Sequence, residues 1–417
     1  MTHLLVLAVS LLAAPASQPV EVAEDVPVGL PTIASITAIT TPPGHHFVGY
    51  YGITPWNASQ SRLFCLEADF GDRLAQLDDR ASICLIDPAN HSLTRIAQTS
   101  AWNLQQGAML HWLPTAADRE LIFNDRVDGR LASVILDVET NKRRLIDRPV
   151  AALSHDGKSA IGVNFDRLRA IRPVTGYAGG DAKGPLVKRP TDDGLFAIDM
   201  TTGKSRLLVS VDACARVVAP PEQLNDQPLW LEHPIFSPDG ARVFFIARGF
   251  DPSTKQIVSV PLVVASDGTK LRSLMPAWVA DGASHFDWMD ERRVVVTRKD
   301  DGKWRHLLID TDGVKAPKPL APDVLTRDGH CTFSPDGRWM ITDTYPDSQR
   351  RQHLFVMDVK TQKAARLASF YSPPEYRGDW RCDLHPRWDR ESRRICIDST
   401  HEGIRQVYVI ELRLPPR

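Results

Sequence analysis

The sequence has no excess of charge of either sign. Its 417 residues include 50 Lys and Arg against 51 Asp and Glu, which gives a formal net charge of -1 at pH 7. Proteins that bind nucleic acids through phosphate contacts usually carry a clear basic surplus. The composition therefore indicates no nucleic-acid partner. With 43% hydrophobic and 24% charged residues, it is typical of an ordinary folded protein.

An apolar run long enough to cross a bilayer is also absent, since such a run needs about 20 residues. The shorter run Leu4 to Ala14 is followed by Pro15 and Ala16, which completes an A-x-A pattern. This arrangement is typical of a secretory signal. We therefore expect residues 1–16 to be a signal peptide, residues 17–31 a linker, and the protein to be secreted or periplasmic, without a membrane-bound part.

Several common catalytic motifs are missing. The chain has no Gly-rich phosphate-binding loop, no G-x-S-x-G, no H-E-x-x-H and no C-x-x-C. Hydrolase and nucleotide-enzyme functions therefore have no support. The few cysteines are too scattered for a disulfide framework, although Cys65 and Cys84 could pair between neighbouring strands. The six are Cys65, Cys84, Cys214, Cys331, Cys382 and Cys396.

What the sequence does contain is a repeat of roughly 45 to 55 residues, a period found in propeller blades. Its clearest copies, residues 233–240 and 330–337, both read His-x-x-Phe-Ser-Pro-Asp-Gly. Pro presets φ and Gly accepts positive φ, so Ser-Pro-Asp-Gly predicts a tight turn between two strands. Weaker copies begin at His285 and His385, and another lies around His155.

Each repeat continues with a second strand pair that ends in an aspartate and a turn, which makes four short strands, as in a propeller blade. The sequence thus predicts an all-β, seven-bladed β-propeller with four-stranded antiparallel blades, forming a single domain over residues 32–417. We expect a monomer. The β-branched segment 32–41 is expected to close the last blade. The blades are predicted at residues 45–97, 98–147, 148–215, 226–275, 276–322, 323–372 and 376–414.

A metal site is predicted from histidines that start four of the repeats. They stand at the beginning of the innermost strand, where neighbouring blades converge. Two cysteines close to them add thiols, and imidazole with thiolate is a donor set that zinc favours. We predict one divalent metal, zinc first, with manganese or calcium as alternatives. Its predicted ligands are His233, Cys331, Cys382 and His385.

Alternatives to this ligand set stay open. His285 and His330 are possible replacements or supporting partners. Alternation along a strand sends His330 and Cys331 to opposite faces, which argues against both binding one ion. A repeated histidine can also have a purely structural role, in which its ring donates a hydrogen bond to a backbone carbonyl of the next blade.

The first three blades are rich in aromatic, amide and basic side chains. Aromatic rings stack on sugar rings, amides bond hydroxyls, and arginine pairs with carboxylates. Residues 167–190 form a basic insertion too long for a simple hairpin loop, and it could bind an acidic polymer. We therefore expect an acidic oligo- or polysaccharide partner. The candidate contacts are Trp102, Asn103, Gln106, Asn124, Arg167 and Arg189.

These features together resemble the propeller-type polysaccharide lyases, namely the oligogalacturonate lyases and the seven-bladed ulvan lyases. The resemblance rests on Ala-Trp-Asn-Leu-Gln-Gln-Gly at 101–107, Phe-Asn-Asp-Arg at 123–126, the ending Asp-Leu-His-Pro-Arg-Trp at 383–388, and the Ser-Pro-Asp-Gly turns. It covers nearly the whole mature chain. The turns are common to propellers, whereas the first and third segments are more specific.

The resemblance implies cleavage of uronate-containing glycans by β-elimination. This reaction needs a base for the C5 proton, a proton donor for the leaving oxygen, and a group that neutralises the carboxylate. The resemblance implies His111 as base or sugar contact, Tyr177 as proton donor, and Arg126 or Arg172 as carboxylate contacts. Asn124 departs from the ulvan lyase pattern, in which a histidine is expected there.

A structural role stays open for each of these residues, with His111 packed on a strand and Tyr177 anchoring its loop. A second hypothesis for the whole protein is a non-catalytic periplasmic propeller that binds a protein or glycan. A lyase requires Arg, Tyr and His to converge on one face, whereas a binding protein requires only an exposed apolar or aromatic patch.

Overall fold

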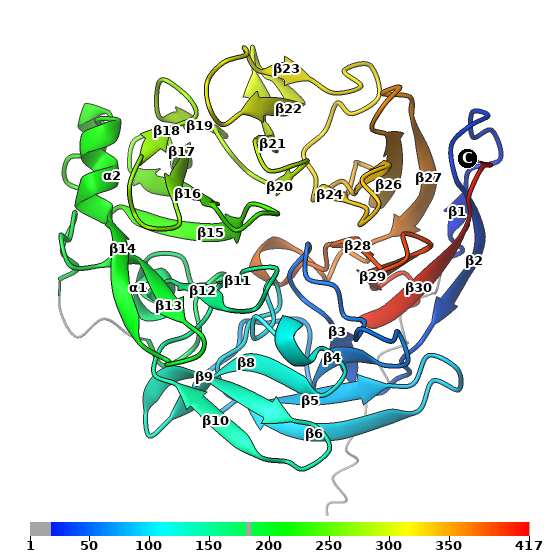
Figure 1. The fold of residues 1–417 in the computed structure, drawn as a ribbon. Coiled ribbons are helices and arrows are strands. Elements are labelled where there is room, and N and C mark those ends of the chain that lie inside the picture. Colours follow the sequence, from blue (N-terminus) through cyan, green and yellow to red (C-terminus); the bar gives the residue numbers. More distant parts are fainter. Residues whose placement is uncertain (1–17, 181–184, 417) are drawn as a thin grey trace, which may run out of the picture.

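Short antiparallel sheets arranged around a central axis make up the fold (Figure 1). The computed structural model describes residues 18–180 and 185–416, so the predicted signal peptide lies outside the described residues. Within these residues the strands form seven sheets. The prediction of a seven-bladed β-propeller is confirmed, and each sheet corresponds to one of the predicted repeats.

In blades 1 to 6 the strands run from the axis outward in sequence order. Blade 1 contains β3 (His45–Phe47), β4 (Leu63–Ala68), β5 (Ala81–Ile86) and β6 (Leu93–Thr99). Blade 2 contains β7 (His111–Trp112), β8 (Glu120–Val127), β9 (Arg130–Asp137) and β10 (Arg143–Ile146). Blade 3 contains β11 (Ala152–Leu153), β12 (Ser159–Gly162), β13 (Gly194–Asp199) and β14 (Ser205–Ser210).

The later blades repeat this order. Blade 4 contains β15 (Trp230–Phe236), β16 (Arg242–Asp251), β17 (Gln256–Ala265) and β18 (Arg272–Ser273), and β19 (Val279–Ala280) also pairs with β17. Blade 5 contains β20 (Phe286–Trp288), β21 (Arg293–Asp300), β22 (Lys303–Asp310) and β23 (Lys318–Pro319). Blade 6 contains β24 (Thr332–Phe333), β25 (Trp339–Thr342), β26 (Arg351–Asp358) and β27 (Ala364–Tyr371).

Blade 7 joins the two ends of the chain. Its inner strands are β28 (Arg387–Trp388), β29 (Arg394–Ser399) and β30 (Gln406–Arg413), and its outer strand is β2 (Thr32–Ala38). Figure 1 shows β2, in blue, beside β30, in red. The closing strand expected from segment 32–41 is therefore present, and it covers an edge that would otherwise be open to other chains.

The N-terminal segment adds one further strand. β1 (Glu21–Val22), within the segment expected to be a linker, pairs with β27 at the outer edge of blade 6. Arg351 binds it through Glu21, at 2.9 Å. The segment before β2 therefore follows the edge of blade 6 before it closes blade 7.

The Ser-Pro-Asp-Gly turns form as their sequence predicts. In blade 4, the Ser237 hydroxyl donates to Asp239, and the backbone N–H of Gly240 donates to the Ser237 carbonyl at 2.8 Å. Gly240 has a φ of 71°, which glycine adopts without strain. Blade 6 repeats this turn at residues 334–337. The turn fixes where each blade's second strand begins.

Helices occur only in short connections within the described residues. α1 (Phe165–Ile171) begins the basic insertion of blade 3, and α2 (Val211–Val217) follows β14. The 3-10 turns are η1 (Pro114–Ala116), η2 (Glu222–Leu224) and η3 (Gly378–Trp380). Among the described helices, none is both long enough and apolar enough to cross a membrane.

Candidate functional site

The four histidines that share one position in their repeats belong to the innermost strands of blades 4 to 7 or directly precede them. His233 lies within β15, and the other three come just before β20, β24 and β28. His285, His330 and His385 lie together near the axis, with ring centroids of neighbours 3.9 and 4.1 Å apart. Tyr51 packs against all three rings. His233 lies on the other side of the two tyrosines, where it stacks on Tyr50 at 5.6 Å.

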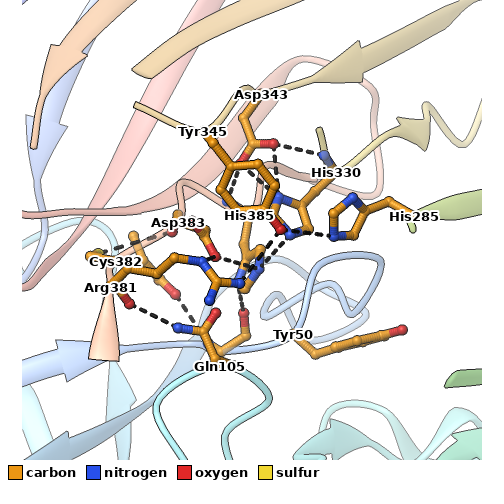
Figure 2. A network of polar contacts seen from close by, with 12 residues as sticks. Tyr50, Gln105, His285, His330, Asp343, Tyr345, Arg381, Cys382, Asp383 and His385 are labelled. Atoms are coloured by element: carbon orange, nitrogen blue, oxygen red, sulfur yellow. Dashed lines mark hydrogen bonds and ion pairs between the residues drawn. The ribbon is translucent and has the colours of Figure 1, made fainter. Parts of the chain in front are cut away.

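His330, Asp383 and His385 form a group whose donor atoms all lie within 4.8 Å of one another (Figure 2). All three side chains are buried. The backbone of His385 has a φ of 45°, in the left-handed region that disfavours residues other than glycine. Such strain is found where surrounding structure holds a residue for function.

The hydrogen bonds of the two histidines show why this group needs a cation. His385 Nδ1 lies 2.5 Å from the Gly49 carbonyl, to which it must donate. His330 Nδ1 lies 2.8 Å from the Asp343 carboxylate and donates to it. As neutral rings, both would direct the lone pairs of their Nε2 atoms at each other, 3.1 Å apart. A proton or a metal ion must therefore lie between them.

The electrostatics of the two rings differ. Burial alone would lower the pKa of His330, but the Asp343 carboxylate outweighs it and raises that pKa. Burial, together with the neighbouring His330, lowers the pKa of His385 well below its usual value. His385 is therefore a neutral ring with a free lone pair, as a metal ligand must be.

Asp383 completes this group without hydrogen bonds of its own. Neither of its carboxylate oxygens has a hydrogen-bond partner in the described structure, although both are buried. Arg381 Nε lies 2.8 Å from one of them as an ion pair. Arg381 offsets part of the cost of burying a carboxylate without hydrogen bonds, and a bound cation would offset more of it.

His285 has the surroundings of a general base. Its Nδ1 lies 3.0 Å from Asp328, which fixes the tautomer and leaves Nε2 as the acceptor. Nε2 lies 3.4 Å from the Tyr345 hydroxyl. Burial, followed by the charge of His330, lowers the pKa of His285 despite Asp328, so the ring is neutral at pH 7. It can accept a proton at Nε2.

Arginines lie on two sides of this group. Arg381 stacks on the Tyr345 ring at 5.1 Å and its guanidinium is partly exposed. Arg172, from the basic insertion, binds the buried Glu232 at 3.1 Å. Arg248 binds the same carboxylate. Glu232 therefore neutralises one of these two arginines, and one positive charge remains.

The Ala-Trp-Asn-Leu-Gln-Gln-Gly segment forms a tight loop beside this site. The Asn103 side chain accepts from the backbone N–H groups of Gln105 and Gln106, at 3.0 and 2.7 Å. Gln106 donates to His233 at 3.2 Å. A Cβ on Gly49 would lie 2.5 Å from the backbone of Gly107, so the two loops touch. Asn103 and Gln106 thus shape the site through the loop.

The predicted metal ligands are only partly brought together. His385 belongs to the group of three, whereas His233, Cys331 and Cys382 do not. Cys331 lies in an apolar cluster with Val295 and Met340. Burial raises the pKa of both thiols, which disfavours the thiolate that a metal needs.

Two predicted residues of the early blades are core residues. Trp102 is completely buried between Phe47 and Phe70, so its ring has no face for a sugar. Tyr177 is also fully buried, stacked on Phe165. These positions contradict a stacking role for Trp102 and a proton-donor role for Tyr177, because neither side chain can reach a bound glycan.

The other predicted polar residues of these blades make internal bonds. Asn124 uses its amide on Val150 and the Tyr177 hydroxyl. Arg126 and Arg167 hold the insertion through Asp166 and through backbone carbonyls. Arg189 binds Asn225. With their polar groups occupied in this way, these residues support the scaffold.

His111 lies on β7, and its Nε2 is buried without a hydrogen-bond partner. Burial lowers its pKa to about 4. No contact joins it to the His330 group in the described residues. Of the four predicted catalytic residues, only Arg172 therefore lies beside the cluster near the axis.

Six further site residues were not selected from the sequence: Glu232, Asp328, Asp343, Tyr345, Arg381 and Asp383. Two of them stood within reach of sequence reasoning, because Arg381 and Asp383 flank the selected Cys382. Glu232, directly before the repeated His233, was within reach in the same way, and a carboxylate one or two residues before a repeated histidine was the available signal. Asp343 and Tyr345 follow a strand in the middle of a repeat, where nothing marked them.

The comparisons with known proteins agree on the fold. No family model and no curated protein matches the chain. Among solved structures, an oligogalacturonate lyase from Vibrio parahaemolyticus matches with a TM-score of 0.62 at 15% identity, over 91% of this chain and 95% of that one. An oligogalacturonate lyase in complex with manganese matches with a TM-score of 0.64 at 18% identity, over 95% and 98%.

A third solved structure, the β-propeller domain of the Trilobed protease from Pyrococcus furiosus, matches with a TM-score of 0.50 at 11% identity, over 89% and 96%. Its presence shows that the propeller is shared by proteins with different activities. The chain has the propeller fold of the oligogalacturonate lyase structures, which confirms at the level of the fold the resemblance to propeller-type lyases.

Proposed function

We propose that this protein is a metal-dependent polysaccharide lyase that cleaves uronate-containing glycans by β-elimination. The observation that carries the proposal is the group of His330, Asp383 and His385, with two Nε2 atoms 3.1 Å apart and a carboxylate without donors. The manganese in one structure of the same fold supports it. A secreted or periplasmic location and an acidic glycan partner belong to the same proposal.

His330, Asp383 and His385 are the residues that would hold the metal. Two imidazoles and a carboxylate suit several divalent ions of the first transition row. Zinc was expected because two thiols were among the predicted ligands. No thiol belongs to this group, and we therefore favour manganese. A bound divalent ion would neutralise the uronate carboxylate and so make the C5 proton more acidic.

The charges of the chain itself point the same way. Three buried carboxylates, Asp328, Asp343 and Asp383, surround the histidines, and among the described residues Arg381 is the one arginine paired with any of them. An anionic substrate would be repelled from such a site. A divalent cation reverses this balance, and so explains how an acidic sugar could enter.

The remaining steps fall to side chains around the group. His285 accepts the C5 proton at Nε2, since Asp328 holds Nδ1 and stabilises the resulting imidazolium. Tyr345 is the nearest proton donor for the leaving oxygen. Burial raises its pKa, so its hydroxyl stays protonated. Arg381 and Arg172 contact substrate carboxylates from the two sides.

An absorbance assay tests the proposal. Metal-free protein is incubated with polygalacturonate, ulvan and glucuronate-containing glycans, with and without manganese, and the ultraviolet absorbance of an unsaturated uronate is followed. We expect a manganese-dependent rise with at least one glycan, and its loss in the Asp383→Ala variant. A flat trace across the whole panel with metal-loaded protein would refute the lyase proposal.

A further inference from the structure

The segment that carries Asp383 has no regular structure. Residues 381–386 belong to neither helix nor strand, between η3 and β28. Apart from its ion pair with Arg381 of the same segment, the Asp383 carboxylate has no hydrogen-bond partner in the described structure, so its position depends on the backbone that precedes it. The contacts of the carbonyls at 380, 381 and 382 therefore decide where this carboxylate lies.

Long side chains from separate parts of the ring bind these three carbonyls. Gln105 donates to the Arg381 carbonyl at 2.9 Å, as seen beside Arg381 in Figure 2. Gln352 donates to the Cys382 carbonyl at 3.0 Å. Arg405 donates to the carbonyls of Trp380 and Arg381 at 3.2 and 2.9 Å. Each of the three carbonyls is thus held from outside its own segment.

The donors come from different blades. Gln105 belongs to the loop between blades 1 and 2, Gln352 to β26 of blade 6, and Arg405 to the hairpin of blade 7. Gln352 and Arg405 are each 1% exposed and Gln105 is 6% exposed. Bonds made away from water are not weakened by competition with solvent.

Arg405 is unusual because its charge has no acidic partner. Within the described residues it forms no ion pair with a carboxylate, and its Nε has no acceptor. Its guanidinium instead binds backbone carbonyls, including that of Leu104, next to Gln105, at 3.4 Å. A buried arginine used in this way ties the 101–107 loop to the Asp383 segment.

We infer that Gln105, Gln352 and Arg405 are positioning residues that set the metal-binding geometry of Asp383. This inference rests on the metal site of the proposed function. Groups that orient a ligand from behind commonly change metal affinity about 10- to 100-fold when removed. Removal of the Gln352 amide leaves the Cys382 carbonyl unpaired, and removal of the Gln105 amide leaves the Arg381 carbonyl with Arg405 alone. Either change allows the segment to shift, which moves Asp383 away from His330 and His385.

The test measures manganese binding to metal-free, full-length protein without substrate, by electron paramagnetic resonance of the free ion. We expect Gln105→Ala and Gln352→Ala each to weaken manganese binding about 10-fold or more. Arg405→Lys keeps the charge but loses the forked donor set, and we expect an intermediate loss. The melting temperature of each metal-free variant is recorded alongside.

Gln406→Ala is the matched control. Gln406 is equally buried and donates to a backbone carbonyl, that of Gly44 at 2.8 Å, but it does not touch residues 380–383. We expect it to lower the melting temperature about as much as the other two glutamine variants while its manganese affinity stays that of the wild type.

The outcomes distinguish a failure of the proposed metal site from a failure of the positioning role. If the wild type binds no manganese, the proposed metal site is wrong and the positioning role falls with it. If the wild type binds manganese and Gln105→Ala and Gln352→Ala bind it as tightly, the site stands and the positioning role is refuted. An equal loss of affinity in Gln406→Ala would also refute it, because general packing would then explain the effect.

Discussion

His285 and His111 differ in the surroundings of their Nε2 atoms. His285 is held by Asp328 and presents Nε2 near Tyr345, whereas the Nε2 of His111 is buried without any partner. The sequence favoured His111 because it lay among residues suited to sugar binding. Only the convergence of separate blades could show that the histidine of blade 5 has the aspartate and tyrosine that a base requires.

Substitution of these two histidines gives the first prediction. We expect His285→Gln to lower kcat about 100- to 10,000-fold, the usual contribution of a general base. His111→Gln should leave kcat within about twofold, measured by the absorbance assay with saturating manganese. Equal losses in the two variants would contradict the role given to His285.

The second prediction concerns stability at acid pH. Burial lowers the pKa of His111 from 6.5 to about 4, so between these values the unfolded chain takes up a proton that the folded protein does not. Stability is therefore lost as the pH falls from 6.5 towards 4. We expect the melting temperature of His111→Gln to fall less over this window than that of the wild type. Parallel curves for the two proteins would show that His111 does not contribute.

At the scale of single elements, the sequence was most informative where the local backbone conformation requires one residue type. The Ser-Pro-Asp-Gly turns revealed the blades because Gly240 and its equivalents occupy positive φ. The 101–107 loop shows that residue types alone do not predict which side chains are free to bind a ligand. Its Trp, Asn and Gln suggested sugar contacts, but Trp102 fills the core and Asn103 closes a turn. Which polar groups stay free depends on how neighbouring blades pack, and a local sequence pattern does not predict that packing.

The third prediction comes from the pairing of β4 with β5. Cys65 and Cys84 are direct register partners, and both are fully buried. Refolding with oxidised glutathione should join them, with two glutathione thiols released, because the sulfurs meet as the strands pair. Denatured protein should then show two fewer thiols than the six of the reduced chain.

Closure of this loop should stabilise the protein by about 3 kcal/mol. A Cys65→Ser variant, refolded in the same way, is the control and should keep all its remaining thiols. Loss of thiols from the variant as well would show that other cysteines react.

Considered as a whole, the molecule brings His330 and His385 together from blades 6 and 7, and Asp383 from the connection between them. A metal bound there links neighbouring blades. The sequence predicted the ring and the convergence of histidines, and it selected one of these three residues. It named His330 only as an alternative and did not select Asp383, because the separation of side chains from different blades depends on how the blades are inclined.

The fourth prediction follows from this link. Manganese at 100 times its Kd should stabilise the wild type by about 2.7 kcal/mol, since only the folded ring offers the full set of ligands. Thermal unfolding with manganese and with a chelator measures this difference. Asp383→Ala should show no such difference, and an equal gain in that variant would place the ion elsewhere.

The pairing of β2 with β30 also has a consequence for biosynthesis. β30 (Gln406–Arg413) is the last described strand in the chain, yet it is the partner of β2, one of the first. A nascent chain can assemble blades 1 to 6 while the ribosome is still working, but His385 and Asp383 cannot settle beside His330 until the final hairpin has emerged. Chains that end before β30 would therefore not form the proposed metal site, however well their early blades had folded.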